Sequence, residues 1–340
     1  MIAIKPGIRY QPHPAFALTA ARLYQYHDLT AEQLSSIASL ADFSATGTRE
    51  LVADDYVYGI KRLAHAHLHS PLLGLMSGSI NGLGDVASHL QKSALARRRE
   101  AWLDLREYPL DGVKVIDRYH YRIRIKGKYP QFLYWLAMPF FSPMPWEADK
   151  FYSQPGLVKK NITLDWYPVG TGPYMLTENN PNARMVLQRN PNFRDERYPC
   201  EGEAEDKNNG LLKDCGQRLP LIDQVVFTRE KEQIPYWNKF LQGYYDASGI
   251  SSDAFDQAVQ VVGGGEAALT DAMQTQGITL STTVATSTFY MGFNWLDSLT
   301  GGSNPATAER ARLLRQAISI AINQEEFISI FQNGRGVAAQ

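Results

Sequence analysis

The amino-acid sequence predicts a mixed fold of strands and helices, of the α/β or α+β class. Segments with alternating apolar residues, typical of strands, and segments with apolar residues at helical spacing both occur along the 340 residues. They follow one another without strict alternation, which leaves both classes open. Hydrophobic residues make up 44% and charged residues 20%, as is ordinary for a globular protein, and the length of 340 residues leaves room for two or three domains.

Charge and hydropathy exclude several classes of function. The net charge of −1 at pH 7 provides no bulk attraction for nucleic acid or anionic lipid. No apolar run approaches the roughly 20 residues of a membrane-spanning helix. The first residues do not resemble a signal peptide, because Lys5, Pro6 and Gly7 interrupt the apolar stretch. We therefore expect a mature or truncated form, or a cytosolic protein.

The N-terminal region begins with a predicted strand over residues 3–10. A short helix is predicted over residues 30–40. Thr30 can cap its N-terminus, and Gln33 stands at the position of a capping-box partner.

A stronger helix is predicted over about residues 53–66, where apolar residues repeat at helical spacing. Asp54 and Asp55 fall in its first turn, where the helix dipole favours carboxylates. A catalytic carboxylate pair is the alternative interpretation. Neighbouring helical residues point about 100° apart, so we expect N-capping instead.

Two paired strands are predicted over residues 113–116 and 119–126. In the second strand, aromatic and aliphatic side chains alternate with basic side chains and His120. This alternation predicts a sheet with one apolar and one solvent-facing side. A short apolar helix is predicted after Pro130.

The most distinctive string is YPVGTGPYMLTENNPNARMVLQRNPNF, residues 167–193, which predicts turn, strand, turn, strand, turn. Gly170 and Gly172 also suggest a phosphate-binding loop. No Gly-Lys-Ser/Thr follows, and Pro173 removes one of the amide donors that such a loop needs. We interpret the string as a structural turn.

Beyond residue 220 the sequence predicts three strands and three helices. The strands cover residues 222–228, 245–248 and 288–295, and the helices cover 232–241, 309–322 and 324–332. Asn323 can cap the last helix with Glu326 as capping-box partner, and Gly334 can end it.

The only two cysteines, Cys200 and Cys215, flank the polar loop EGEAEDKNNGLLKD, which could not pack a core. A disulfide closing this loop would contribute about 3 kcal/mol through chain entropy. Two unrelated thiols are the alternative. We expect the disulfide, which favours an oxidising compartment.

Three histidines, His65, His67 and His69, alternate in AHAHLHS. On a strand they would share one face and could bind zinc or nickel. They follow a predicted helix, however, and a helix C-terminus also favours partly protonated histidines. We prefer the helix end. A metal-dependent hydrolase that uses these histidines with Asp54 or Asp55 remains an alternative function.

A basic run, Arg97 to Arg99 with Lys92 nearby, contains no interleaved aromatic residues. It is typical of a solvated helix face, and nucleic-acid binding would need a wider basic surface. No Gly-x-Ser-x-Gly or His-Glu-x-x-His motif occurs in the sequence. We expect no catalytic residues, no cofactor and no resident metal.

Three strings, taken in order, carry a family resemblance. They are TRELVADDYVYGIKRLA, then VGTGPY with its following strand and RNPNF, then FYMGFNW with ERARLLRQAISIAINQEEFISIFQNGRG. Together they resemble extracellular solute-binding proteins of family 5, the peptide/nickel-binding periplasmic receptors of ABC importers. The resemblance covers nearly the whole chain.

The resemblance implies a type II periplasmic-binding-protein-like fold, with two lobes and an inserted subdomain in lobe I. Residues 1–165 would form most of that subdomain and residues 166–285 the core of lobe I. Residues 286–340 would form the crossover strand and the start of lobe II. Family members extend beyond this chain at both ends, so we expect a fragment with a truncated lobe II and weak affinity or none.

The resemblance also implies the function. The protein would capture a di-/oligopeptide or similar small solute between its lobes, without catalysis. It would act as a periplasmic monomer that docks on an ABC permease in the inner membrane. A non-transporting binding module on the same fold is a further alternative.

The crossover TFYMGFNW is the first predicted ligand site, because a strand there can pair with a peptide backbone. Tyr290, Phe293 and Trp295 would supply aromatic walls, and Asn294 would supply an amide that both donates and accepts hydrogen bonds. Alternation places 293 and 295 on one face, so not all of them can line the cleft. A plain core strand is the alternative.

The second predicted ligand site is the turn around residues 247–252. The resemblance places this turn at the cleft floor, where free N–H groups can meet a ligand carboxylate. An ordinary loop is the alternative. The candidate residues are Ser248, Gly249, Ile250 and Ser251.

Overall fold

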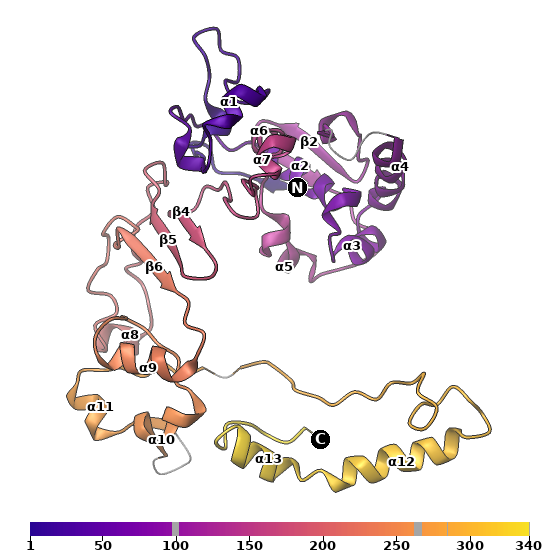
Figure 1. Ribbon diagram of the computed structural model, residues 1–340, viewed down its shortest axis with the longest axis vertical. Helices are drawn as coiled ribbons and strands as arrows, with labels where there is room; N and C mark the ends of the chain where they lie inside the picture. Colours follow the sequence, from indigo (N-terminus) through magenta and orange to yellow (C-terminus); the bar gives the residue numbers. More distant parts are fainter. Residues whose placement is uncertain (97–101, 262–266, 284, 340) are drawn as a thin grey trace. The chain divides into compact units, whose positions relative to one another are not determined.

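The computed structural model describes residues 1–96, 102–261, 267–283 and 285–339. The chain divides into two compact units, Met1–Arg229 and Glu230–Gln340, which we describe separately (Figure 1). The sequence resemblance predicts boundaries between the subdomain and the lobes at residues 165 and 285. These boundaries remain a prediction. In the described part of the chain, no helix is long and apolar enough to cross a membrane.

The first unit contains a three-stranded antiparallel sheet in the order β1-β3-β2. Its strands are β1 (Ile2–Ala3), β2 (Val113–Asp117) and β3 (His120–Ile123). Tyr121 is buried and Arg122 is exposed, which confirms the predicted apolar and solvent-facing sides.

The predicted strand over residues 3–10 is wrong beyond Ala3. Gly7 adopts a positive φ of 80°, which turns the chain away from the sheet. Only an isolated antiparallel bridge between Arg9 and Glu50 follows.

Most helices of the first unit contribute, together with this sheet, to one large hydrophobic core. Helix α2 packs on β2 and β3 and buries Ile60 in a core that also contains Tyr121 and Phe151. The helices are α1 (Ala31–Ser35), α2 (Ala53–Arg62), α3 (Leu73–Ser79), α4 (Leu83–Ala96), α5 (Phe132–Leu136), α6 (Trp146–Tyr152), α7 (Pro155–Val158) and α8 (Ala204–Asn208).

The predicted helix starts are confirmed, but the two helices end earlier than predicted. Thr30 and Gln33 form the capping box of α1. At α2 the carboxylate of Asp55 accepts a hydrogen bond from the backbone N–H of Val52, while Asp54 points to solvent. These orientations agree with the capping interpretation of Asp55.

The distinctive string forms a second antiparallel sheet in the order β4-β5-β6. Its strands are β4 (Tyr174–Asn180), β5 (Arg184–Arg189) and β6 (Gln224–Thr228). The glycine turn before β4 is structural, as predicted. The amide of Gly170 donates to the Gln11 side chain, and the carbonyl of Gly172 accepts from the side chain of Asn190.

Cys200 and Cys215 form a disulfide, which confirms the predicted pairing. Two backbone hydrogen bonds at the base of the loop join Tyr198 to Gln217 and Gly216. The polar loop is therefore closed both covalently and by its backbone.

The second unit contains five helices and one small two-stranded sheet in its described residues. They are α9 (Gln233–Leu241), α10 (Phe255–Ala258), β7 (Val259–Val261), β8 (Ala267–Leu269), α11 (Asp271–Thr275), α12 (Ala308–Ala321) and α13 (Gln324–Phe331). A small core gathers Trp237, Phe255 and Met273. As predicted, Asn323 caps α13 by accepting from the N–H of Glu326.

Two predicted strands of this unit, residues 245–248 and 288–295, are irregular instead. A strand needs a neighbour that accepts its backbone hydrogen bonds, and neither segment is paired in the described part of the unit. The side chain of Tyr245 donates to Glu230. Aromatic side chains of the second segment, such as Phe289, are exposed.

Candidate functional site

The predicted crossover site divides into two parts. Phe293 and Trp295 line a hollow of about 550 Å³ against one face of α12. Tyr290 is 87% exposed and lies outside this lining, as does Asn294. The complete lining comprises Phe293, Trp295, Arg312, Arg315, Gln316, Ser319 and Ile320.

The turn after Trp295 is built from local side-chain hydrogen bonds. The Asn294 side chain accepts from the N–H of Leu296. The Asp297 carboxylate accepts from the backbone N–H and the hydroxyl of Thr300 and from the N–H of Leu299. These hydrogen bonds, with the Thr300 backbone first, lower the pKa of Asp297. The carboxylate therefore stays ionised at neutral pH and keeps the turn closed.

Glycine is required where this turn folds back on itself. A Cβ added to Gly301 would lie 2.3 Å from the carbonyl oxygen of Asp297 and 2.4 Å from that of Trp295. Both contacts are with backbone atoms, so a side chain here would force the chain to move. The N–H of Gly301 donates to the Asp297 carbonyl at 3.0 Å.

Arg315 on α12 joins the helix to this turn. Its guanidinium carbon lies 4.3 Å from the centroid of the Trp295 ring. Its Nη1 donates to the carbonyl oxygens of Thr300 at 2.5 Å and Gly301 at 3.2 Å. One cation thus stacks on an aromatic face and satisfies two backbone acceptors.

The chemistry of the hollow suits binding. An exposed indole and apolar side chains offer contact area, while guanidinium and amide groups offer hydrogen bonds. The hydroxyl of Ser319 donates to the backbone carbonyl of Arg315 at 2.9 Å. Among the seven lining residues no hydroxyl is paired with an imidazole or carboxylate base.

The second predicted site, the turn around residues 247–252, has a structural part. Ser251 is buried, and its hydroxyl accepts from the N–H of Ala254. Ile250 packs against the small core of the unit. Ser248 and Gly249 lie in an irregular segment, where the Ser248 hydroxyl donates to the Gly249 carbonyl. Ligand contact by these four residues remains a prediction.

The histidine segment forms a short 3₁₀ turn, Ala66–Leu68, just after α2. The Nδ1 of His65 accepts from the backbone N–H of His67 at 3.3 Å. Burial lowers the pKa of His65, which opposes the partial protonation expected at a helix end. No group of three metal-ligating side chains occurs among the residues that the structure describes. The predicted basic run at 97–99 lies outside those residues.

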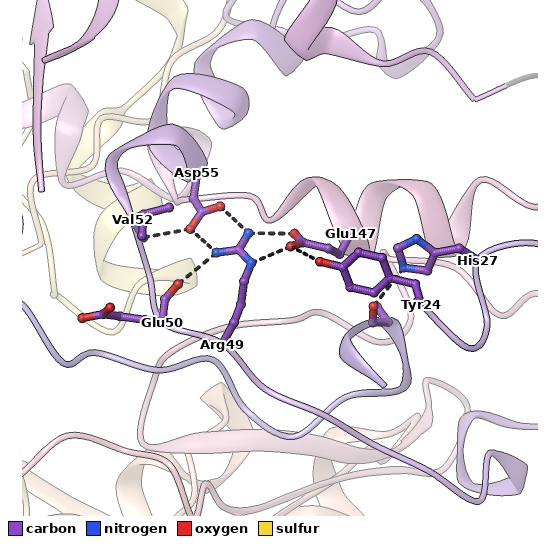
Figure 2. Close-up of polar contacts among 8 residues, drawn as sticks. Tyr24, His27, Arg49, Glu50, Val52, Asp55 and Glu147 are labelled. Atoms are coloured by element: carbon purple, nitrogen blue, oxygen red, sulfur yellow. Dashed lines mark hydrogen bonds and ion pairs between the residues drawn. The ribbon is translucent and has the colours of Figure 1, made fainter. Parts of the chain in front are cut away.

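A buried ionic cluster in the first unit was not predicted from the sequence. Figure 2 shows the guanidinium of Arg49 between the carboxylates of Asp55 and Glu147, each only 2% exposed. The shortest contacts are 2.6 Å from Nη2 to Asp55 Oδ1 and 2.7 Å from Nε to Glu147 Oε1. The hydroxyl of Tyr24 also donates to Glu147 at 3.0 Å.

One cation in this cluster serves two buried carboxylates. Burial raises the pKa of Asp55, because Arg49 offsets the lost solvation only in part. Burial alone would lower the pKa of Arg49, but the hydrogen bonds that its guanidinium donates to Asp55 and Glu147 raise it. We interpret the cluster as a structural connection between α2 and α6. Arg49 and Glu147 are 98 positions apart, and no local sequence pattern relates them.

Comparison with known proteins assigns the chain to a family. The family model of bacterial extracellular solute-binding proteins, family 5 middle, matches residues 46–340. The chain therefore belongs to this family, as the sequence resemblance predicted. The family assignment also confirms the predicted fold class, the α/β fold of two-lobed periplasmic binding proteins.

Two curated relatives match parts of the chain. The periplasmic oligopeptide-binding protein OppA of Salmonella typhimurium is 27% identical over 195 residues, covering 54% of this chain and 32% of the relative. The nickel-binding periplasmic protein of Escherichia coli is 33% identical over 99 residues, covering 28% of this chain and 17% of the relative. The matches thus span about a third or less of each relative's length.

Solved structures with similarity include two proteins named OppA. Listeria monocytogenes OppA bound to peptide matches with a TM-score of 0.42 and 15% identity, covering 62% of this chain and 33% of that chain. Burkholderia pseudomallei OppA matches with a TM-score of 0.41 and 18% identity, with the same coverage of each chain.

Proposed function

We propose that this chain is part of the substrate-binding component of an ABC importer, which binds a di-/oligopeptide or similar small solute. The observation that carries the proposal is the family match over residues 46–340. The relative with the longer curated match is named as an oligopeptide-binding protein, which favours a peptide as the solute.

Binding would occur between two lobes, with residues 286–340 contributing the crossover and the start of the second lobe. The hollow beside α12 offers an indole that is 60% exposed, and apolar parts of a peptide can cover this surface. Closure of the lobes would remove the ligand from water and signal to an ABC permease in the inner membrane. No chemical step is needed, so the protein acts as a periplasmic receptor and not as an enzyme.

A nickel ion is a second candidate solute, because the chain also matches a relative named as nickel-binding. The histidine segment does not support this candidate. Among the residues that the structure describes, this segment does not form part of any group of three His, Cys, Asp or Glu side chains that could hold a metal ion. Nickel therefore enters the experiment as a competing ligand.

The test is a thermal-shift screen of the natural-length protein, followed by calorimetric titration. The probes are di-, tri- and pentapeptides of alanine, the tripeptide Ala-Phe-Ala, free amino acids and Ni²⁺. We expect at least one peptide to raise Tm and to bind, because a ligand that binds only the folded state stabilises it.

Variants then locate the contact. Trp295→Ala should weaken peptide binding, whereas Tyr244→Ala should not. Tyr244 is an exposed aromatic residue of the same unit that lies outside the hollow. If only Ni²⁺ stabilises the protein, the proposed solute is a metal ion and not a peptide. If no probe stabilises it, the proposed function is contradicted.

A further inference from the structure

Two residues lie close to the Trp295 indole, Arg315 and Gly302. The guanidinium carbon of Arg315 lies 4.3 Å from the ring centroid. The ring also lies directly against Gly302, where an added Cβ would be 2.4 Å from Cζ3 and 2.7 Å from Cε3. The indole is therefore confined although 60% of the residue is exposed.

Arg315 also fixes the backbone that carries this indole. It donates to the carbonyl oxygens of Thr300 and Gly301, within the turn that Asp297 closes. The N–H of Gly302 donates to the Trp295 carbonyl at 3.4 Å, which links the end of the turn to its beginning. A single side chain thus joins α12 to both the ring and the turn.

We propose that Arg315 is a positioning residue that holds the Trp295 indole as one wall of the ligand hollow. This inference rests on the proposed function, and it adds a residue that does not itself need to touch the ligand. A planar guanidinium can stack on the ring and donate to two carbonyls at once, whereas a lysine ammonium cannot reproduce this geometry.

The first experiment needs no ligand. The Trp295 contribution to fluorescence is isolated by subtracting the emission of Trp295→Phe, because the chain contains six tryptophans. In Arg315→Met we expect the Trp295 emission to shift to longer wavelength and acrylamide quenching to increase. Arg310→Met is the matched control, since Arg310 is exposed on the same helix and does not line the hollow.

The second experiment measures binding of Ala-Phe-Ala by calorimetry. Arg315→Met should weaken binding about three- to tenfold, the range expected when one cation–π contact that orders a ligand-binding ring is lost. Arg315→Lys should recover part of this loss, because it retains the charge and one donor group. Arg310→Met should bind like the unchanged protein.

The outcomes separate the two proposals. A Trp295 signal that is identical in Arg315→Met and the unchanged protein would overturn the positioning role, as would equal affinity for Ala-Phe-Ala. If no peptide binds the unchanged protein, the proposed function fails, and the fluorescence result alone decides whether Arg315 positions Trp295. If Arg315→Met does not fold, Arg315→Lys replaces it in both measurements. The lysine cannot stack as a planar guanidinium does, so the shift of the Trp295 emission to longer wavelength is still expected.

Discussion

Two arginines in the two units show different uses of the same side chain. Arg49 lies among buried groups and pairs with two carboxylates that are almost inaccessible to water. Arg315 lies at the surface of the second unit, where it stacks on Trp295 and donates to backbone carbonyls. The first compensates buried charge, whereas the second orders a partly exposed aromatic ring.

The comparison extends to the surroundings of each arginine. In the first unit helices and a sheet enclose a large core, and the polar groups of the Arg49 cluster have several partners. The second unit has a smaller core and exposes large apolar side chains on α12 and α13, such as Leu313 and Phe331. We therefore expect substitutions in the first unit mainly to change stability, and those around Trp295 mainly to change recognition.

The largest expected effect is that of Arg49→Met. Removing the cation leaves two buried carboxylates without their partner, which should destabilise the first unit by about 3–5 kcal/mol. Urea denaturation measures the loss, and hydrogen exchange should locate it within residues 1–229. Arg118→Met is the control, because the Arg118–Glu50 pair is exposed and should contribute little. If both variants lowered the free energy of unfolding equally, the expectation that buried ion pairs contribute more than exposed ones would be wrong for this protein.

The next largest effect is expected for the double variant Cys200→Ser/Cys215→Ser. The disulfide closes a loop with a sequence separation of 15, so its loss should cost about 3 kcal/mol through chain entropy. The measurement is the change in denaturation midpoint of the first unit. An unchanged midpoint would mean that the backbone hydrogen bonds at the base of the loop keep it closed without the disulfide.

Acid should destabilise the first unit through the buried histidine His13. Burial lowers the pKa of His13 from 6.5 to about 3, so the folded protein keeps this imidazole neutral while the unfolded chain protonates it. The unfolded state then binds more protons, and stability falls as pH decreases from about 6.5 towards 3. The slope due to His13 should approach about 1.4 kcal/mol per pH unit.

Two measurements check this pH dependence. NMR titration of the His13 ring should show no protonation in the folded protein above pH 4. His13→Gln should reduce the pH slope of the unfolding free energy, while His67→Gln, at an exposed position, should leave it nearly unchanged. Protonation of His13 near pH 6 without unfolding would contradict the expectation.

The smallest effect is expected in the Trp295 turn. Gly301→Ala forces a side chain onto two backbone carbonyls and should cost about 1 kcal/mol. Gly292→Ala is the control, because the nearest atom to its added Cβ is a ring atom of Tyr290 at 3.7 Å. Thermal unfolding of the second unit distinguishes them, and equal Tm values would show that the turn shifts freely.

Local patterns predicted much of the fold. The capping residues Thr30 and Asn323, the hairpin within residues 167–193 and the alternation of Tyr121 with Arg122 follow from interactions within a few positions. The structure shows each of them. Predictions for residues 245–248 and 288–295 were wrong because a strand depends on a neighbour that local propensity does not supply.

The candidate site was less accessible to prediction. The residue types of the crossover indicated an aromatic surface, and Phe293 and Trp295 do line a hollow. Arg315 lies 20 positions beyond Trp295 in the helix predicted over residues 309–322, and nothing in its spacing related it to the indole.

The sequence by itself determined the helix caps, the strand alternation and the family to which the chain belongs, and it favoured the disulfide between its only two cysteines, which the structure shows. For the caps and the strand alternation, interactions between near neighbours in the sequence are sufficient. Only the tertiary structure decided that Glu147 pairs with Arg49 and that Arg315 stacks on Trp295. Such contacts depend on where the chain returns in space, and the free energy of burying a charge or confining a ring arises only there.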